Sequence, residues 1–264
     1  MGHVRVGRLP KRFGWQHVLG SLYAAAGTPG AGSDDQIFAA ATAAAGKALG
    51  RSRQQDSLAH AYWYLLKLAL ASRSEDFQSE VLDLGIQVPA GGSGFALLGA
   101  VMDNLRQDMR RRGWVTPVDQ IALQSFQTAI SEIVAEESQS LFGSTVETAQ
   151  QAIRRYSTKQ NVAGLGRRFF SEFAFRILSR ALESELASSV AAGGRFRDEG
   201  QLSNFRDRLK SYCWDISKLV EDFAGGWYSK HAWMEDITEE QTKKFTAYAV
   251  EKLLSEAAPS PARA

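Results

Sequence analysis

The stretch from Asp222 to Thr238, DFAGGWYSKHAWMEDIT, gathers the residues of this sequence that are best suited to chemistry. Tyr228, Lys230 and His231 lie within four positions and could line a pocket in which His231 transfers a proton. Adjacency in a sequence is weak evidence for a shared site. We therefore expect a structural anchor here, and we keep an enzyme with an unrecognised site near Tyr228 and His231 as an alternative.

The two glycines of this stretch have an explanation without chemistry. Helical periodicity over residues 202–223 requires a stop, and Gly225 or Gly226 can adopt the left-handed conformation that ends a helix. We expect the helix to end there.

The aromatic residues that follow fall outside the periodic pattern. We expect Trp227, Tyr228 and Trp233 to pack between the last two helices and to fix the turn before Thr238 caps the final helix. They would then hold two helices together instead of forming a reaction site.

The common catalytic and cofactor motifs are missing. The sequence has no GxxxxGK[ST], GxGxxG, HExxH, CxxC or GxSxG pattern. Its histidines are His3, His17, His60 and His231, and no two of them are three or four positions apart on one helix. The single cysteine, Cys213, is near an apolar face, where a free cysteine is usually a small buried hydrophobe. We expect no metal and no cofactor.

Clusters of basic residues indicate an alternative function in nucleic-acid binding. The segment MRRRGW places arginines before a tryptophan, and residues 154–168 contain several cations and no acid. Arginines at helix C-termini are also expected from the helix dipole, and acidic blocks at 132–147 and 235–240 offset them. The candidate residues for this alternative are Arg110, Arg111, Arg112, Arg167 and Arg168.

Aromatic side chains on polar helix faces indicate contact with a partner. Phe175 projects among Arg168 and Glu172, and Trp214 lies four positions from a lysine on each side. Aromatic residues of this kind pack against further helices or anchor protein interfaces. The candidate protein-binding residues are Phe175, Trp214, Trp227, Tyr228 and Trp233.

The elements that must position these residues are helices. All six prolines lie between segments of helical periodicity. Leu165, Phe169, Phe173 and Ile177 form one row at four-residue spacing on the longest such segment. Ser93 and Thr116 precede periodic segments and are expected N-caps. The sequence predicts an all-α protein of about eight to nine helices, as a multi-helix bundle or a curved helical stack with little or no sheet.

The glycine-rich segment 85–94, GIQVPAGGSG, is either a domain linker or a loop. We expect an N-terminal helical part over 1–90, a C-terminal helical part over 91–258 and a disordered tail over 259–264. One continuous domain is the alternative.

Composition is that of an ordinary globular protein, with 44% hydrophobic and 23% charged residues and a net charge of +2. We expect no secretory signal at the N-terminus, and a lone cysteine favours a reducing, cytoplasmic location. The longest apolar run, 61–70, is too short to cross a membrane and should be a buried helix. By elimination we expect a non-catalytic helical interaction or scaffold subunit of a larger cytoplasmic assembly, whose partner is another protein.

Overall fold

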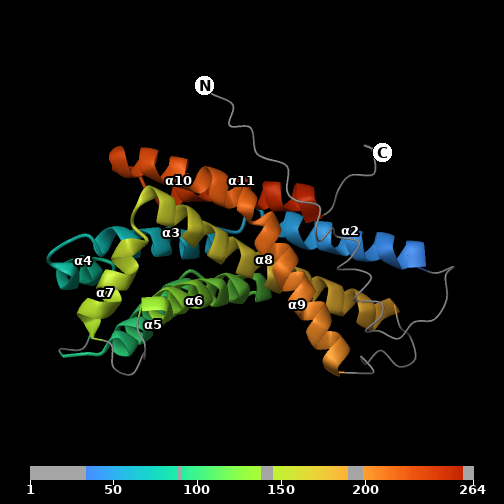
Figure 1. Cartoon of the computed structure of the whole chain (residues 1–264), viewed down its shortest axis with the longest axis horizontal. Helices are drawn as coiled ribbons and strands as arrows, with labels where there is room; N and C mark the ends of the chain where they lie inside the picture. Colours follow the sequence, from blue (N-terminus) through green and yellow to red (C-terminus); the bar gives the residue numbers. More distant parts are fainter. Residues whose placement is uncertain (1–33, 89–90, 138–144, 190–198, 258–264) are drawn as a thin grey trace. The chain divides into compact units, whose positions relative to one another are not determined.

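The computed structural model describes residues 34–88, 91–137, 145–189 and 199–257, and within these ranges the chain is built from helices (Figure 1). The helices are α2 Asp34–Ser52, α3 Asp56–Ala71, α4 Phe77–Asp83, α5 Gly94–Arg111, α6 Pro117–Glu137, α7 Val146–Arg155, α8 Lys159–Ser189, α9 Glu199–Ile216, α10 Lys218–Trp233 and α11 Glu239–Ala257. None of the described residues forms a strand; an isolated bridge joins Ser93 and Thr145. The predicted all-α multi-helix fold is confirmed.

The chain divides into two compact units, and neither is continuous in sequence. Unit 1 contains α2, α8 from Phe170 onward, α9 and α11 from Tyr248 onward. Unit 2 covers Gln54–Phe169 and Val220–Ala247. The boundaries therefore fall inside α8, α10 and α11. The predicted division near residue 90 stays a prediction, and the predicted tail 259–264 lies outside the described residues.

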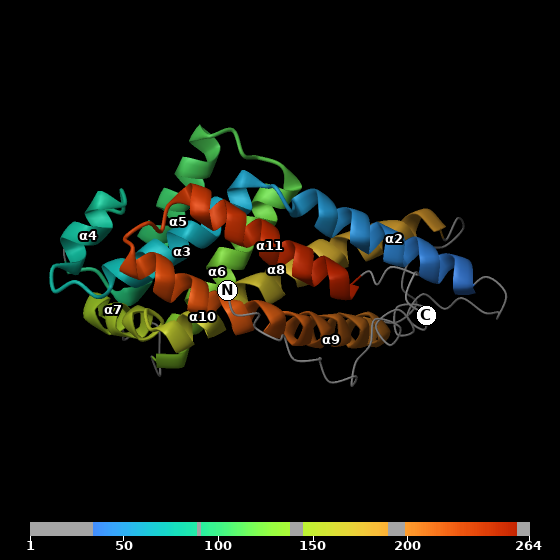
Figure 2. The ribbon, with the colours of Figure 1, turned by 90° about the horizontal axis from the view of Figure 1, so that it is seen from above.

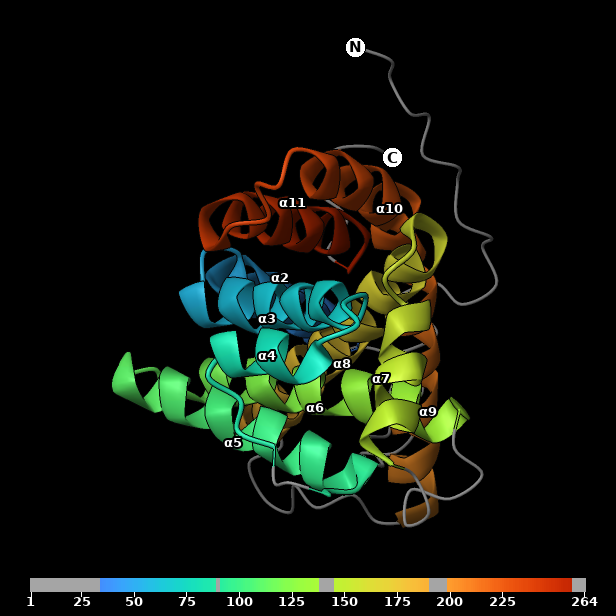
Figure 3. The same ribbon diagram turned by 90° about the vertical axis from the view of Figure 1, so that its left-hand side faces the viewer.

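Unit 2 is organised around α3. Most residues of this helix are buried, which confirms the buried helix predicted from the apolar run. Figure 3 shows α3 between α6 and the pair formed by α10 and the beginning of α11. Tyr62 packs against Phe169 of α8 and Phe245 of α11, with ring centroids 5.2 and 5.3 Å apart. Each fully buried leucine of α3 contributes about 1.5–3 kcal/mol relative to an exposed one.

Unit 1 has its own apolar core. Phe173, Phe205 and Leu209 are fully buried, and the four-residue row predicted on the longest segment continues here through Ile177. The hydroxyl of Tyr212 donates to the carbonyl of Glu256 at 2.9 Å and so joins α9 to the end of α11. The alternation of buried and exposed positions thus follows the helical period.

The helix end expected at Gly225 or Gly226 is wrong. α9 ends at Ile216, α10 begins at Lys218, and both glycines lie inside α10. Neither has a positive φ. A Cβ on Gly225 would lie 2.5 Å from the carbonyl oxygen of Lys159, so glycine is required because α8 and α10 approach closely. From above, α10 and the beginning of α11 run side by side (Figure 2).

Replacing Gly225 by Ala should destabilise the protein by about 1–3 kcal/mol, because the new methyl group forces the backbones of α8 and α10 apart. The matched control is Gly226→Ala, where nothing lies within 4 Å of the added Cβ. That substitution should leave stability unchanged or raise it by up to about 1 kcal/mol through helix propensity. Urea denaturation measures both, and equal effects of the two substitutions would contradict the close approach.

Candidate functional site

Tyr228 is a buried link between three helix segments. Its side chain is 1% exposed, and its hydroxyl donates to the carbonyl of Ser157, which follows α7, at 3.0 Å. The guanidinium of Arg73, just after α3, donates to the Tyr228 hydroxyl at 3.1 Å and to the same Ser157 carbonyl. Burial raises the pKa of Tyr228, and the Arg73 charge opposes that rise. The hydroxyl therefore joins α10 to the ends of α3 and α7.

His231 and Lys230 are directed elsewhere. The Nδ1 atom of His231 lies 2.6 Å from the Oδ1 atom of Asp236, and its ring packs on Trp227 with centroids 4.6 Å apart. Lys230 is exposed to solvent. The polar groups proposed for an enzyme site thus have different partners, although Tyr228 and His231 are three positions apart on one helix.

The tryptophans of α10 have opposite environments. Trp227 is half-buried and packs on Phe245 of α11, with centroids 4.7 Å apart, so its expected role between the last two helices is confirmed. Trp233 was expected in the same place but is 89% exposed, and the adjacent Met234 is 55% exposed. Trp233 is the last residue of α10.

The backbone after α10 is held in an uncommon conformation. Glu235 has φ 53°, in the left-handed region where glycine usually ends a helix. The N–H of Asp236 donates to the carbonyl of His231 at 3.1 Å, and the Oγ1 of Thr238 then accepts from the N–H of Gln241 at 3.2 Å, as predicted for the cap of the final helix. We call Trp233, Met234 and Glu235 the α10 tip.

The other two aromatic candidates belong to unit 1. Trp214 on α9 is 39% exposed, and Phe175 on α8 is half-buried. Nothing tests whether either contacts a partner, so both stay predictions. Cys213, next to Trp214, is fully buried, and burial raises the pKa of its thiol well above the ordinary value. That environment suits a packing role rather than a nucleophile.

The arginines considered for nucleic-acid binding are mostly paired with acids. Arg112 makes two hydrogen bonds to Glu239, at 2.8 and 2.9 Å, and one to Asp108 at 3.0 Å. Arg111 lies 3.3 Å from the same Asp108 carboxylate. Arg110 is exposed.

The second pair of basic residues, on α8, is paired in the same way. Arg167 lies 3.0 Å from Glu221, and Arg168 lies 2.7 Å from Glu136. A carboxylate beside each guanidinium reduces the attraction that these residues would offer to phosphate.

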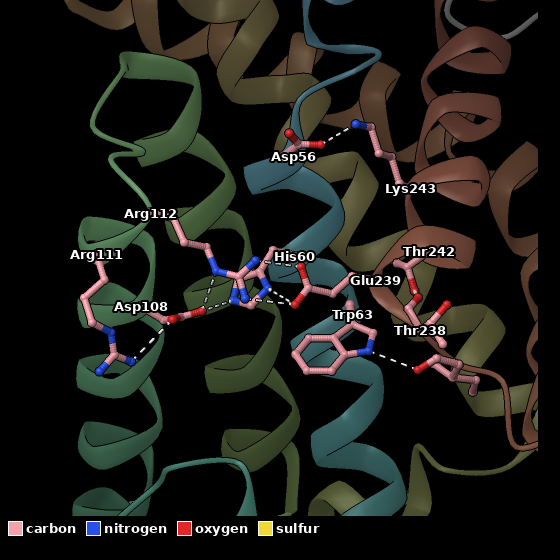
Figure 4. A network of polar contacts seen from close by, with 11 residues as sticks. Asp56, His60, Trp63, Asp108, Arg111, Arg112, Thr238, Glu239, Thr242 and Lys243 are labelled. Carbon is pink, nitrogen blue, oxygen red and sulfur yellow. Dashed lines mark hydrogen bonds and ion pairs between the residues drawn. The ribbon is translucent and has the colours of Figure 1, made fainter.

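A histidine that the sequence did not single out lies at the centre of a polar cluster (Figure 4). His60 of α3 is 2% exposed. Its Nε2 lies 2.8 Å from the Oδ2 of Asp108, and its Nδ1 lies 3.3 Å from the Oε1 of Glu239. With Arg112 bridging the two carboxylates, these four residues form what we call the His60 cluster.

Two aromatic rings pack against the imidazole of His60. The rings of Trp63 and Trp114 lie 5.4 and 5.5 Å from the imidazole. Burial is the main cause that lowers the pKa of His60, and the Arg112 charge acts in the same direction, while the Glu239 and Asp108 carboxylates oppose both. The cluster joins distant parts of the chain. The one feature of the sequence that could have indicated it is a histidine inside an apolar helix, because a buried histidine requires a polar partner.

In the part of the chain that the structure describes, no three side chains of the His, Cys, Asp and Glu types gather as a metal ion would need. Within the same ranges, no helix combines the length and apolarity that a membrane crossing requires. No protein-family model, curated protein or solved structure matches the chain. The function is therefore inferred from the geometry of the residues of this chain.

The free energy of unfolding should fall as the pH is lowered from about 7 to about 5. The unfolded His60 titrates at 6.5 and the folded one below it, so the unfolded chain binds more protons in this interval. A His60→Gln variant should show a shallower pH dependence than the wild type. Urea titrations across this range measure both, and an unchanged slope in His60→Gln would contradict the assignment.

Proposed function

We propose that the chain is a non-catalytic helical interaction or scaffold subunit that contacts another protein through the α10 tip. The observation that carries the proposal is the 89% exposure of Trp233, next to Met234 at 55%. Tryptophan is among the residues that contribute most to the binding energy of protein interfaces. An exposed tryptophan lowers solubility and adds nothing to the packing of the fold.

The α10 tip is held rigidly, which supports a role in recognition. The His231–Asp236 pair closes the turn at 2.6 Å, and the indole N–H of Trp63 donates to the carbonyl of Ile237 at 3.0 Å. The left-handed φ of Glu235 then sets the direction of the chain between these contacts. A preorganised tip loses little conformational entropy on binding.

The contacts that the other candidate residues make within the chain support the same proposal. Tyr228 and His231 are engaged in structural contacts, which favours binding over catalysis. The carboxylates beside Arg112, Arg167 and Arg168 favour a protein partner over nucleic acid. A cytoplasmic assembly is part of the proposal, and the single, free cysteine Cys213 fits such a reducing location.

Affinity purification from the native host with mass spectrometry should identify a stoichiometric protein partner. With that partner purified, Trp233→Ala should weaken binding at least about tenfold by isothermal titration calorimetry, because an anchoring tryptophan is lost. The control is Leu82→Ala, which removes another apolar side chain, 57% exposed, from the same unit. Equal affinity of Trp233→Ala and wild type would contradict the proposal, and so would salt-sensitive binding to DNA or RNA with no protein partner.

A further inference from the structure

The His60 cluster contains an unusual buried histidine. Both ring nitrogens are shielded from solvent, and neither has a partner in hydrogen-bonding geometry among the described residues, although carboxylate oxygens lie 2.8 and 3.3 Å away. Buried polar atoms are almost always hydrogen-bonded, so this arrangement requires an explanation. The imidazole lies in contact with both carboxylates.

The protonation state of the ring decides which carboxylates it can hold. A neutral imidazole has one N–H, so it can donate to Asp108 or to Glu239 but not to both. Its other nitrogen then turns a lone pair toward a carboxylate oxygen. An imidazolium has two N–H groups and can donate to both carboxylates at once.

The two carboxylates come from different elements. Asp108 lies on α5, and Glu239 lies in the first turn of α11. We propose that His60 is a proton-sensitive latch: the neutral ring can donate to one of the two carboxylates, and the protonated ring can donate to both and so strengthens the link between α5 and the first turn of α11 that Arg112 makes in either state. This role is independent of any partner of the α10 tip.

The charged groups around the ring define how the latch works. From α5, Asp108 and the C-terminal Arg112 face the ring, and Arg111 contacts Asp108 from outside at 3.3 Å. From α11, Glu239 faces it. Arg112 holds Glu239 in both states, so proton uptake adds a second cation to an existing ion pair and does not create a new contact between the helices.

One turn away, α3 and α11 have a separate link. Lys243 of α11 lies 2.5 Å from Asp56 of α3, and both side chains are about half exposed. This ion pair lies beyond the His60 cluster (Figure 4). It limits an opening of α11 to its first turn, where Glu239 lies.

The latch predicts opposite pH dependences for local and global opening. When only the first turn of α11 opens, the ring keeps its contacts with Trp63 and Trp114 and loses Glu239, whose charge raises the pKa of His60. The closed state then binds the proton more strongly, and acid slows opening. When the whole chain unfolds, the ring gains full hydration, and acid favours unfolding. A merely structural histidine would show the second effect without the first.

Hydrogen exchange of single amides by NMR tests the proposal in the full chain. The amide of Thr242 donates to the carbonyl of Thr238 at 3.0 Å and reports on the first turn of α11. Between about pH 7 and about pH 5 its protection factor should rise about three- to tenfold, the effect of one added hydrogen bond. The reference amide is Ala149, which donates to Thr145 at 3.1 Å in the first turn of α7 and should show no rise.

Two variants isolate the carboxylate. Glu239→Gln should lose most of the rise at Thr242, because the charge that attracts the imidazolium is gone. Glu240→Gln, at the next position, removes an exposed carboxylate paired with Lys244 at 2.8 Å and should keep the rise. The proposal is overturned if wild-type protection at Thr242 stays level or falls with acid, or if Glu240→Gln loses the rise as Glu239→Gln does. Because the first of these results needs no variant, poor folding of a variant does not protect the proposal.

Discussion

The burial of α3 is the constraint on which unit 2 depends. Its leucines and alanines lie against helices on several sides, so the buried polar groups of its aromatic side chains depend on partners from other elements. The indole of Trp63 donates to the carbonyl of Ile237, and the hydroxyl of Tyr64 accepts from Asn104 at 2.5 Å. These partners determine where the turn before α11 and the middle of α5 lie.

The polar groups at the two ends of α3 have partners of different kinds. At the C-terminal end, Arg73 and Tyr228 converge on the carbonyl of Ser157, and each group has a defined donor or acceptor. Near the N-terminal end, His60 lies between two carboxylates, and the protonation state of its ring decides how many of them it can donate to. One end is therefore a fixed joint, and the other can respond to protons. The exposed α10 tip lies on the turn that α3 holds in place through Trp63.

Local features were predictable because their causes are local. Ser93 accepts the N–H of Ala96 at 3.2 Å, as its place before a periodic segment predicts, and the all-α fold follows from periodicity of the same kind. Features that depend on tertiary contact were missed. Gly225 has the residue type of a helix end, but glycine is required there because the carbonyl of Lys159, which is far away in sequence, lies close to it in space. The His60 cluster joins residues from separate helices, and the exposure of Trp233 depends on where α10 ends.

Native-state hydrogen exchange along α3 tests most directly whether this helix organises unit 2. The account predicts that the amides of Leu65, Leu66 and Leu68 exchange only through global unfolding, with the free energy that denaturant titration gives, and that the short helix α4 exchanges at a much lower free energy. Exchange of the α3 amides at the same free energy as those of α4 would contradict it. In that case α3 would not be the buried element on which the other contacts depend.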